Sequence, residues 1–241
     1  RRGLNEAVES PHPRVAARLR CGDAMYLPSH FEETRAVALH ALIGSRPLGT
    51  LITQDRSGAL QADAIPFVLD PGPGPHGTLR GHVARANPVW REARVEVQAL
   101  VVFQGAQGYI SPNWYPSKAQ HGRAVPTWNY IVVQARGRLQ AIDDREWLRA
   151  FVTRLTERHE ARQPEPWQVS DAPADYLEAM LGAIVGIEIE LSSLVGKWKA
   201  SQNRSSADHA GVVAGLAALA ARDDDAFAAE LAAVMGASPN G

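Results

Sequence analysis

The sequence predicts an α+β fold that is mainly β, built on a small antiparallel barrel with inserted and C-terminal helices. Roughly six or seven strand-like segments follow one another between residues 48 and 191, with turn residues between them. They do not alternate regularly with helices, as the strands of a doubly wound parallel sheet do. Barrel closure is the natural arrangement for such strands, because it removes exposed sheet edges.

Composition places the chain among ordinary globular proteins. It has 241 residues, of which 45% are hydrophobic and 21% charged, and a formal net charge of -1. This charge gives no general attraction to nucleic acid, so a contact with DNA would need a local basic patch. The single cysteine, Cys21, excludes an intramolecular disulfide and is typical of a reducing compartment. No apolar run approaches the ~20 residues of a membrane span and no secretion signal is visible, so we expect a cytoplasmic protein without membrane contact.

The first regular segments are a helix and two strands. Ser29 is a suitable cap for a helix over residues 31–44. Strands are predicted over residues 48–54 and 62–69, with turn residues between them. Pro66 places the second strand at a sheet edge or at a bulge, because proline donates no hydrogen bond to a neighbouring strand.

A basic turn follows the next predicted strand, over residues 77–83, and leads into a predicted helix over residues 88–95. Free N–H groups at a helix start attract anions, and cations beside them can hold a phosphate. The alternative is a solvated basic turn beside an ordinary helix cap. The basic and capping groups of this turn are Arg80, His82, Arg85 and Asn87.

The middle of the chain continues in strands. Residues 99–104 form an apolar run, residues 105–108 are predicted to turn, and residues 109–111 begin another strand. Prolines bracket two aromatic side chains in residues 112–118, which predicts a rigid loop that presents ring faces. A longer strand is predicted over residues 127–139.

The apolar period changes from two to about 3.6 at residue 143, which marks the start of helical structure. A helix is predicted over residues 143–161, and a second follows a cap at Asp171. A β-branched strand is predicted over residues 184–191. The Ala-rich tail, residues 207–235, is predicted to be helical with a break near Asp223.

Several common chemistries lack their motif. The sequence has no Gly-x-Ser-x-Gly elbow, and Cys21 lies in an unpatterned segment, so nucleophilic catalysis is not expected. The histidines, including His159, show no metal-ligand spacing, so no metal site is expected. Neither the Rossmann glycine fingerprint nor a phosphate-binding Gly-Lys-Ser/Thr loop is present.

A distributed set of side chains remains that suits a flat heterocycle with a phosphate tail. Cations suit the phosphate, amides suit ring edges, and aromatic rings suit stacking. Each member also has a structural interpretation, such as a packed tryptophan or a solvated lysine. The set comprises Arg80, Arg85, Lys118, Arg123, Lys197, Lys199, Arg204, Asn87, Gln104, Asn129, Gln202, Asn203, Tyr109, Trp114, Tyr115, Trp128 and Trp198.

Longer motifs carry a family resemblance. They read MYLPSHF, PLGTL, RGHVARANP, YISPNWY, VPTWNY and KWKASQN, and they begin at residues 25, 47, 80, 109, 125 and 197. Together they resemble the PaiB family, whose members are named FMN-binding negative transcriptional regulators. The resemblance runs from residue 25 to about residue 216.

The resemblance implies an FMN-binding split β-barrel, similar to that of pyridoxamine-phosphate oxidase, and a homodimer with FMN in clefts between the subunits. By position, the basic turn is similar to the phosphate-holding segment of that fold. Ser111 and Trp114 would line the cleft, and Lys199, Gln202 and Asn203 would reach it from the partner chain. The cofactor-binding residues implied in this way are Arg80, His82, Arg85, Asn87, Ser111, Trp114, Lys199, Gln202 and Asn203.

The expected organisation has three parts: a flexible extension (residues 1–24), an FMN-binding split-barrel domain (25–204) and a helical tail (205–241). The expected function is that of an FMN-binding negative regulator, acting on DNA directly or through a regulatory protein. A flavin-dependent oxidoreductase or a haem-handling enzyme on the same barrel is the alternative, with His82 or Tyr115 as proton donor. A third alternative is a dimeric scaffold that has lost its ligand.

Overall fold

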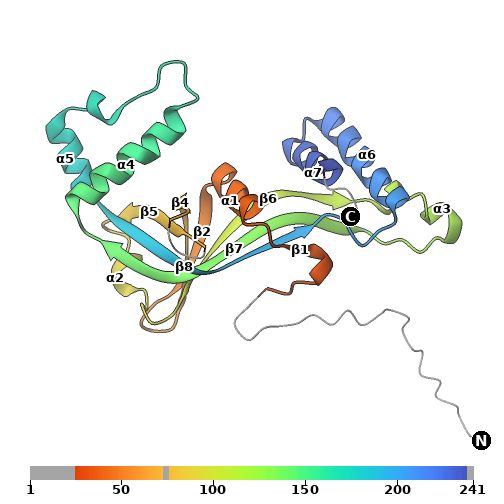
Figure 1. The fold of residues 1–241 in the computed structure, drawn as a ribbon, viewed down its shortest axis with the longest axis horizontal. Coiled ribbons are helices and arrows are strands. Elements are labelled where there is room, and N and C mark those ends of the chain that lie inside the picture. Colours follow the sequence, from red (N-terminus) through yellow and green to blue (C-terminus); the bar gives the residue numbers. More distant parts are fainter. Residues whose placement is uncertain (1–24, 73–75, 238–241) are drawn as a thin grey trace, which may run out of the picture.

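The computed structural model describes residues 25–72 and 76–237, so the expected N-terminal extension lies outside the described residues. Within these ranges the strands form one antiparallel sheet, whose path is β3-β2-β6-β7-β8-β5-β4 with β1 paired to β8 (Figure 1). The strands are β1 (Glu32–Glu33), β2 (Leu48–Gln54), β3 (Leu60–Pro66), β4 (Val68–Asp70), β5 (Thr78–Ala84), β6 (Ala99–Ile110), β7 (Thr127–Ile142) and β8 (Ile184–Lys199).

The sheet curls until its two edges meet. β3 and β4 stand at opposite ends of the strand path, yet only Phe67 separates them in the chain. A Cβ atom at Gly81 of β5 would lie 3.2 Å from side-chain atoms of Ile65 in β3, so the two edges are in contact. The curled sheet confirms the antiparallel, mainly β, α+β fold that the sequence predicts.

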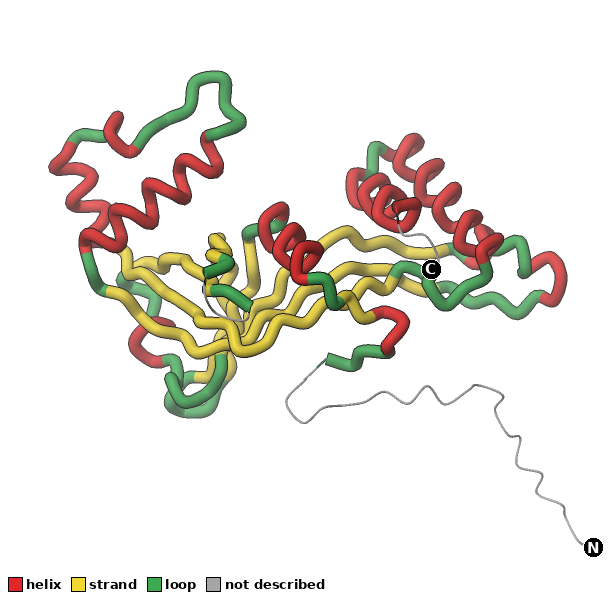
Figure 2. The backbone as a smooth tube through the Cα atoms, in the orientation of Figure 1, coloured by secondary structure: helices red, strands yellow, loops and turns green. Residues whose placement is uncertain are grey.

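Helices cover the sheet at three places (Figure 2). α1 lies over the middle of the strands, α4 and α5 lie at one end, and α6 and α7 lie at the other, where α3 projects. The helices are α1 (Ala36–Ser45), α2 (Val89–Glu92), α3 (Lys118–His121), α4 (Arg145–Glu160), α5 (Ala174–Gly182), α6 (Ser206–Asp223) and α7 (Ala226–Ala237).

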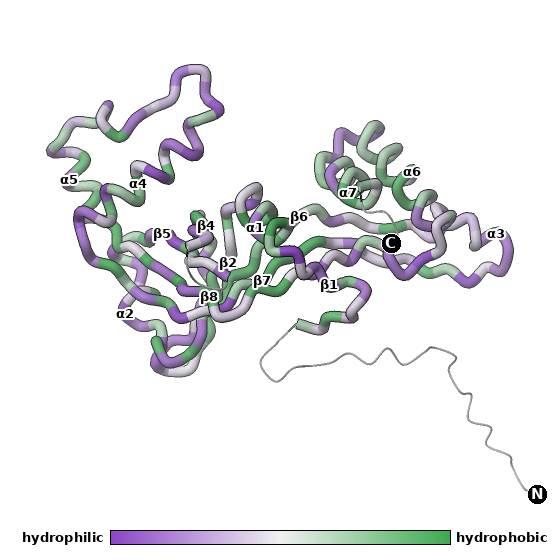
Figure 3. The backbone as a smooth tube through the Cα atoms, viewed as in Figure 1, coloured by the Kyte–Doolittle hydropathy of each residue, from purple (hydrophilic) through white to green (hydrophobic). Residues whose placement is uncertain are grey.

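The core follows the period-two alternation of the long strands. Ile131 and Val133 of β7 and Ile187 and Ile189 of β8 are buried, while the residues between them are more exposed. Figure 3 shows this alternation as changing hydropathy along the strands. The side chain of Met235 in α7 belongs to the same core, so the C-terminal helices pack on the sheet.

Two helices are shorter than the sequence predicts. The helix expected from residue 31 begins only at Ala36, because Glu32–Glu33 pairs with β8 instead; residues Ser29–Phe31 form a single 3-10 turn. The three-turn helix expected over residues 88–95 is the single turn α2, because Ala93 bridges to Asp55 of the β2–β3 hairpin. Sheet pairing overrides helix propensity at both places.

Strand boundaries also differ. The turn expected over residues 105–108 is a β-bulge inside a continuous β6, where the pairing with β7 shifts between Gln104 and Gln107. The strand expected over residues 62–69 is divided at Phe67 into β3 and β4. Pro66 ends β3, and β3 lies at the edge of the sheet path, as its proline predicts.

Phe67→Ala should destabilise the protein by about 3–5 kcal/mol, because the ring is fully buried where the sheet edges meet. The ring packs edge-on against Phe103, with the ring centroids 6.1 Å apart. Urea unfolding measures the loss. Phe227→Ala, at a half-exposed ring on α7, is the control and should cost less than about 1 kcal/mol. Equal losses would mean that Phe67 does not hold the edges together.

Candidate functional site

The structure places Arg80 and His82 within β5, and only Arg85 and Asn87 of the predicted basic turn follow the end of the strand. The arginines of this segment, which we still call the basic turn, are already paired with acidic side chains. Arg80 donates from Nη1 to Asp70 and from Nε to Glu188, each at 2.5 Å. Arg154 of α4 also donates to Asp70, at 3.2 Å. The predicted phosphate ligand therefore lies in a network where two carboxylates balance two guanidinium groups.

Arg85 joins the turn to the elements beside it. Its Nη atoms donate to both carboxylate oxygens of Asp143 at 2.6 and 2.7 Å, and its Nε donates to the carbonyl oxygen of Gly182 at 2.7 Å. The hydrogen bond from Arg85 lowers the pKa of Asp143. Most of the guanidinium donors thus hold the start of β8 and the loop before α4.

Asn87 follows the end of β5, whereas His82 lies within the strand. The Asn87 side chain accepts a hydrogen bond from the backbone N–H of Val89 at 2.9 Å and donates to Asp63 at 2.8 Å, which fixes the start of α2. His82 packs edge-on against Phe151 of α4, with ring centroids 5.9 Å apart, and its buried Nδ1 has no hydrogen-bond partner. Burial lowers the pKa of His82, so the ring is neutral at pH 7.

A second group of side chains lies on the outward surface of β6, β7 and β8, which we call the open face. Trp128 is 50% exposed and faces Tyr109, which is 48% exposed. Trp128 Nε1 donates to Gln107 at 3.2 Å. A hollow of about 190 Å³ lies here, lined by Gln104, Gly105, Gln107, Trp128, Tyr130, Ile131 and Val132. The hollow offers ring faces and amide groups together, as a flat heterocycle requires.

Three cations border the open face, which we call the lysine cluster: Lys197, Lys199 and Arg204. Lys199 is paired with Tyr130 in the β7–β8 register, and its Nζ lies 5.9 Å from the tyrosine ring centroid. Burial, then the charges of Lys197 and Arg204, lower the pKa of Lys199. Sequence reasoning included these cations but assigned neither Lys197 nor Arg204 to the cofactor site, because their neighbours are remote in sequence.

The remaining predicted residues have structural roles in this chain. Ser111 accepts a hydrogen bond from the backbone of Asn113, and the Trp114 ring packs against Gly215 of α6, where a Cβ atom would lie 2.3 Å away. Gln202 accepts from Ala200 N–H at 2.8 Å and donates to the carbonyl of Trp198, closing the turn after β8.

Asn203, the last of the predicted residues, is exposed. It lies beside Ser201, whose φ of 63° is unusual for a non-glycine residue. Contact of these residues with a cofactor stays a prediction.

A single chain does not bring the basic turn and the open face together. In the sheet register Arg80 lies opposite Glu188, and Tyr130 lies opposite Lys199. Glu188 and Lys199 are separated along β8 by ~36 Å, at about 3.3 Å per residue. The basic turn and the open face are therefore too far apart to contact one small ligand within a single subunit.

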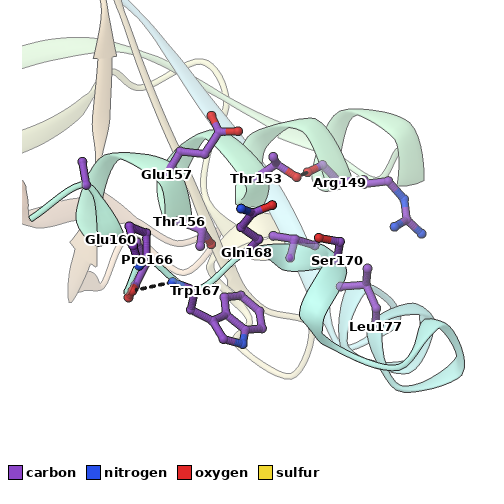
Figure 4. A pocket seen from close by; sticks show the side chains of 12 residues that line it. Arg149, Thr153, Thr156, Glu157, Glu160, Pro166, Trp167, Gln168, Ser170 and Leu177 are labelled. Carbon is purple, nitrogen blue, oxygen red and sulfur yellow. Dashed lines mark hydrogen bonds between the residues drawn. The ribbon is translucent and has the colours of Figure 1, made fainter. Parts of the chain in front are cut away.

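A larger hollow, of about 520 Å³, lies between α4 and α5 (Figure 4). Trp167 lies beside it, and the backbone N–H of Trp167 donates to Glu160 at 3.0 Å. Arg149, a cation in its wall, is paired with Glu178. This hollow provides an aromatic ring but no unpaired cation for a phosphate.

The described ranges, 25–72 and 76–237, contain no group of three His, Cys, Asp or Glu side chains placed to hold a metal ion. None of their helices is both long enough and apolar enough to cross a membrane.

Comparisons with known proteins identify relatives in fungi and bacteria. The chain is 35% identical to an uncharacterized protein of Aspergillus fumigatus, covering 80% of this chain and 90% of the relative. It is 30% identical to the protease synthase and sporulation protein PAI 2 of Bacillus subtilis, covering 78% of this chain and 87% of the relative.

Solved structures share the fold at low sequence identity. The conserved hypothetical protein Rv2991 of Mycobacterium tuberculosis matches with a TM-score of 0.53 and 12% identity, covering 75% of this chain and 94% of that one. The FAD and heme binding protein of Mycobacterium smegmatis matches with a TM-score of 0.51 and 17% identity, covering 70% of this chain and 73% of that one.

The family match confirms the resemblance seen in the sequence and the expectation that FMN is the cofactor. A family model described as "Putative FMN-binding domain" matches residues 25–193, which is most of the chain and all of the sheet except residues 194–199 of β8. On this match, and on the identity with PAI 2, the chain belongs to the FMN-binding domain family that includes PaiB-type proteins.

Proposed function

We propose that the protein is a homodimeric negative transcriptional regulator that holds FMN against its open face. The observation that carries the proposal is the exposed ring of Trp128 beside the amides of Gln104 and Gln107. Ring faces and amides bind a flat heterocycle from its face and its edge. FMN, when bound, supplies a redox centre, so its reduction or loss would change the dimer and its effect on transcription.

The size of the hollow supports a dimer. Pockets for cofactors usually enclose about 300–1,000 Å³, whereas the hollow on the open face has about 190 Å³. The exposed Trp128 and Tyr109 add apolar surface that a single chain leaves in water. A second copy placed over the open face would bury these rings and enclose the cofactor.

A composite site explains the separation along β8. We place the basic turn of one subunit over the open face of the other, so that Arg85 of one chain and Trp128 of the second chain contact the same FMN. Each dimer then has two equivalent sites, related by the twofold axis.

Neither candidate proton donor offers a specific argument for the oxidoreductase. Tyr115 is 4% exposed and its buried hydroxyl has no hydrogen-bond partner among the described residues. His82 is neutral, and its Nδ1 is buried near α4. A group that delivers a proton must come within hydrogen-bond reach of the reacting atom, and the Tyr115 hydroxyl and the Nδ1 atom of His82 are enclosed by protein.

Trp128→Ala should weaken FMN binding about 5- to 150-fold, because stacking of a base on an aromatic ring contributes about 1–3 kcal/mol. Quenching of flavin fluorescence during titration measures the dissociation constant. Trp167→Ala, at a similarly exposed tryptophan beside the α4–α5 hollow, is the control and should leave the dissociation constant for FMN unchanged. Equal affinities of both variants and the wild type would remove the open face from the site.

Mixed dimers test the composite site. Arg85→Ala and Trp128→Ala homodimers should each bind FMN weakly, whereas a heterodimer of the two variants should regain one full-affinity site. In that heterodimer one site receives both altered side chains and the other receives none. Differently tagged subunits, purified in tandem and titrated with FMN, give the stoichiometry. Thermal melting confirms that each variant is folded, and a heterodimer without any full-affinity site would show that both residues act within one chain.

Loss of the gene should alter transcript levels in the source organism, and the wild-type gene but not the Trp128→Ala variant should restore them. Purified FMN-loaded protein should not consume NADH over repeated turnovers. RNA sequencing and absorbance at 340 nm give the two readouts. Sustained NADH oxidation with unchanged transcripts would support the oxidoreductase instead.

A further inference from the structure

We infer that the lysine cluster is a binding site for a phosphate group. The inference deepens the proposed function, because one source of this group is the phosphate of FMN; the other is a separate phosphorylated ligand or inorganic phosphate. It concerns Lys197 and Arg204 as well as Lys199, and it places the strongest anion site at the opposite end of β8 from the basic turn.

Lys197 is an enclosed cation. It is only 6% exposed, and its Nζ donates to the backbone carbonyl of Tyr26 at 2.7 Å. The rings of Tyr26 and Tyr130 each lie with their centroids 5.4 Å from Nζ. Cation–π contacts hold the ammonium in place but do not neutralise it. An ammonium has three donors, so a buried anion could accept from the remaining ones.

The other two cations extend the charge toward the open face. Lys199 lies on the same face of β8 as Lys197, since strand side chains alternate, and its Nζ donates to Thr127 at 2.7 Å and to the carbonyl of Trp128. The guanidinium of Arg204 stacks on Tyr115, 4.9 Å from the ring centroid. In the described part of the chain no carboxylate forms an ion pair with any of the three cations.

Acidic groups near the cluster are few. Residues 97–142, which supply β6, α3 and β7, contain no Asp or Glu. Asp208 lies near Arg204, but its carboxylate accepts from the backbone and the hydroxyl of Ser117 at 3.0 and 2.7 Å. Glu32 is opposite Lys197 in the β1–β8 register but forms no ion pair with it in this structure.

A phosphate would relieve the charge imbalance. Taking a cation out of water without a counter-charge is costly, and like charges close together add to that cost. Burial and the neighbouring cations both lower the pKa of Lys199, which reflects this cost. Phosphate oxygens accept short, strong hydrogen bonds from ammonium and guanidinium groups. Arg80 and Arg85, by contrast, already have carboxylate partners.

Lys199→Met and Arg204→Met should each weaken the binding of inorganic phosphate to the FMN-free protein about tenfold or more, as expected for a lost charged hydrogen bond. Phosphorus NMR titration, which does not depend on FMN, gives the dissociation constant. Lys118→Met is the matched control, because this exposed lysine of α3 bonds to Asn113, and it should bind phosphate as the wild type does.

Two further arms identify the source of the phosphate. If FMN provides it, FMN-loaded protein should not bind inorganic phosphate, and Lys199→Met should abolish the preference for FMN over riboflavin. If the ligand is separate, FMN-loaded protein should still bind phosphate, and that preference should persist. Absence of FMN binding would defeat the proposed function but leave the phosphate titration readable.

Glu32→Gln distinguishes the inference from a simple ion pair. A phosphate site predicts tighter phosphate binding in this variant, because a nearby negative charge is removed. If Glu32 instead neutralises Lys197 in solution, the variant should melt at a lower temperature and its phosphate affinity should stay unchanged. That result would overturn the inference. So would a finding that Lys199→Met and Arg204→Met bind phosphate and FMN with the same affinities as the wild type.

Discussion

The continuous pairing of β7 with β8 is the constraint on which the arrangement depends. Backbone hydrogen bonds between them run from Tyr130 opposite Lys199 to Ile142 opposite Gly186, interrupted by one irregularity near Gly137. A strand this long is stiff when both neighbours hydrogen-bond to it. It therefore holds the two groups of candidate side chains at fixed, distant positions. In the dimer that we propose, each subunit would supply two half-sites, and oligomerisation would complete a ligand site rather than only add stability.

The arginines of the basic turn have carboxylate partners, whereas the cations of the lysine cluster form no ion pair among the described residues. Arg80 and Arg85 are multiply hydrogen-bonded to carboxylates and backbone carbonyls, so they already have a structural role in joining this segment to β8, to the end of α5 and to the loop before α4. To bind phosphate, either would have to share or exchange these partners. The number of cations in a segment therefore does not show which of them can bind a phosphate. That depends on whether a carboxylate already faces each cation in the folded chain.

Sequence reasoning predicted the fold, whereas the cofactor-binding residues stay a prediction. The bounds of β2 and the cap-bounded α4 were visible because alternation and helical period are local patterns. The length of β6 was not, because the glycines at its bulge also favour turns. The ion pair from Arg85 to Asp143 joins residues 58 positions apart, and the burial of Lys197 depends on the segment around Tyr26. Such contacts arise only when the chain closes, so residue types alone could not show which cations have carboxylate partners and which do not.

The bulge in β6 determines which side chains the open face presents. If all residues of β6 continued in strict alternation from Gln104, with no bulge before Gln107, Ala106 and Ile110 would face outward and Tyr109 would face the core. The bulge reverses which residues of the last part of β6 face outward, so that Gln104, Gln107 and Tyr109 share one surface. Deletion of one residue within the bulge would restore regular pairing and leave Tyr109 opposite Trp128, whereas deletion of Gly108, beyond the bulge, would turn Tyr109 toward the core without any substitution in the site itself.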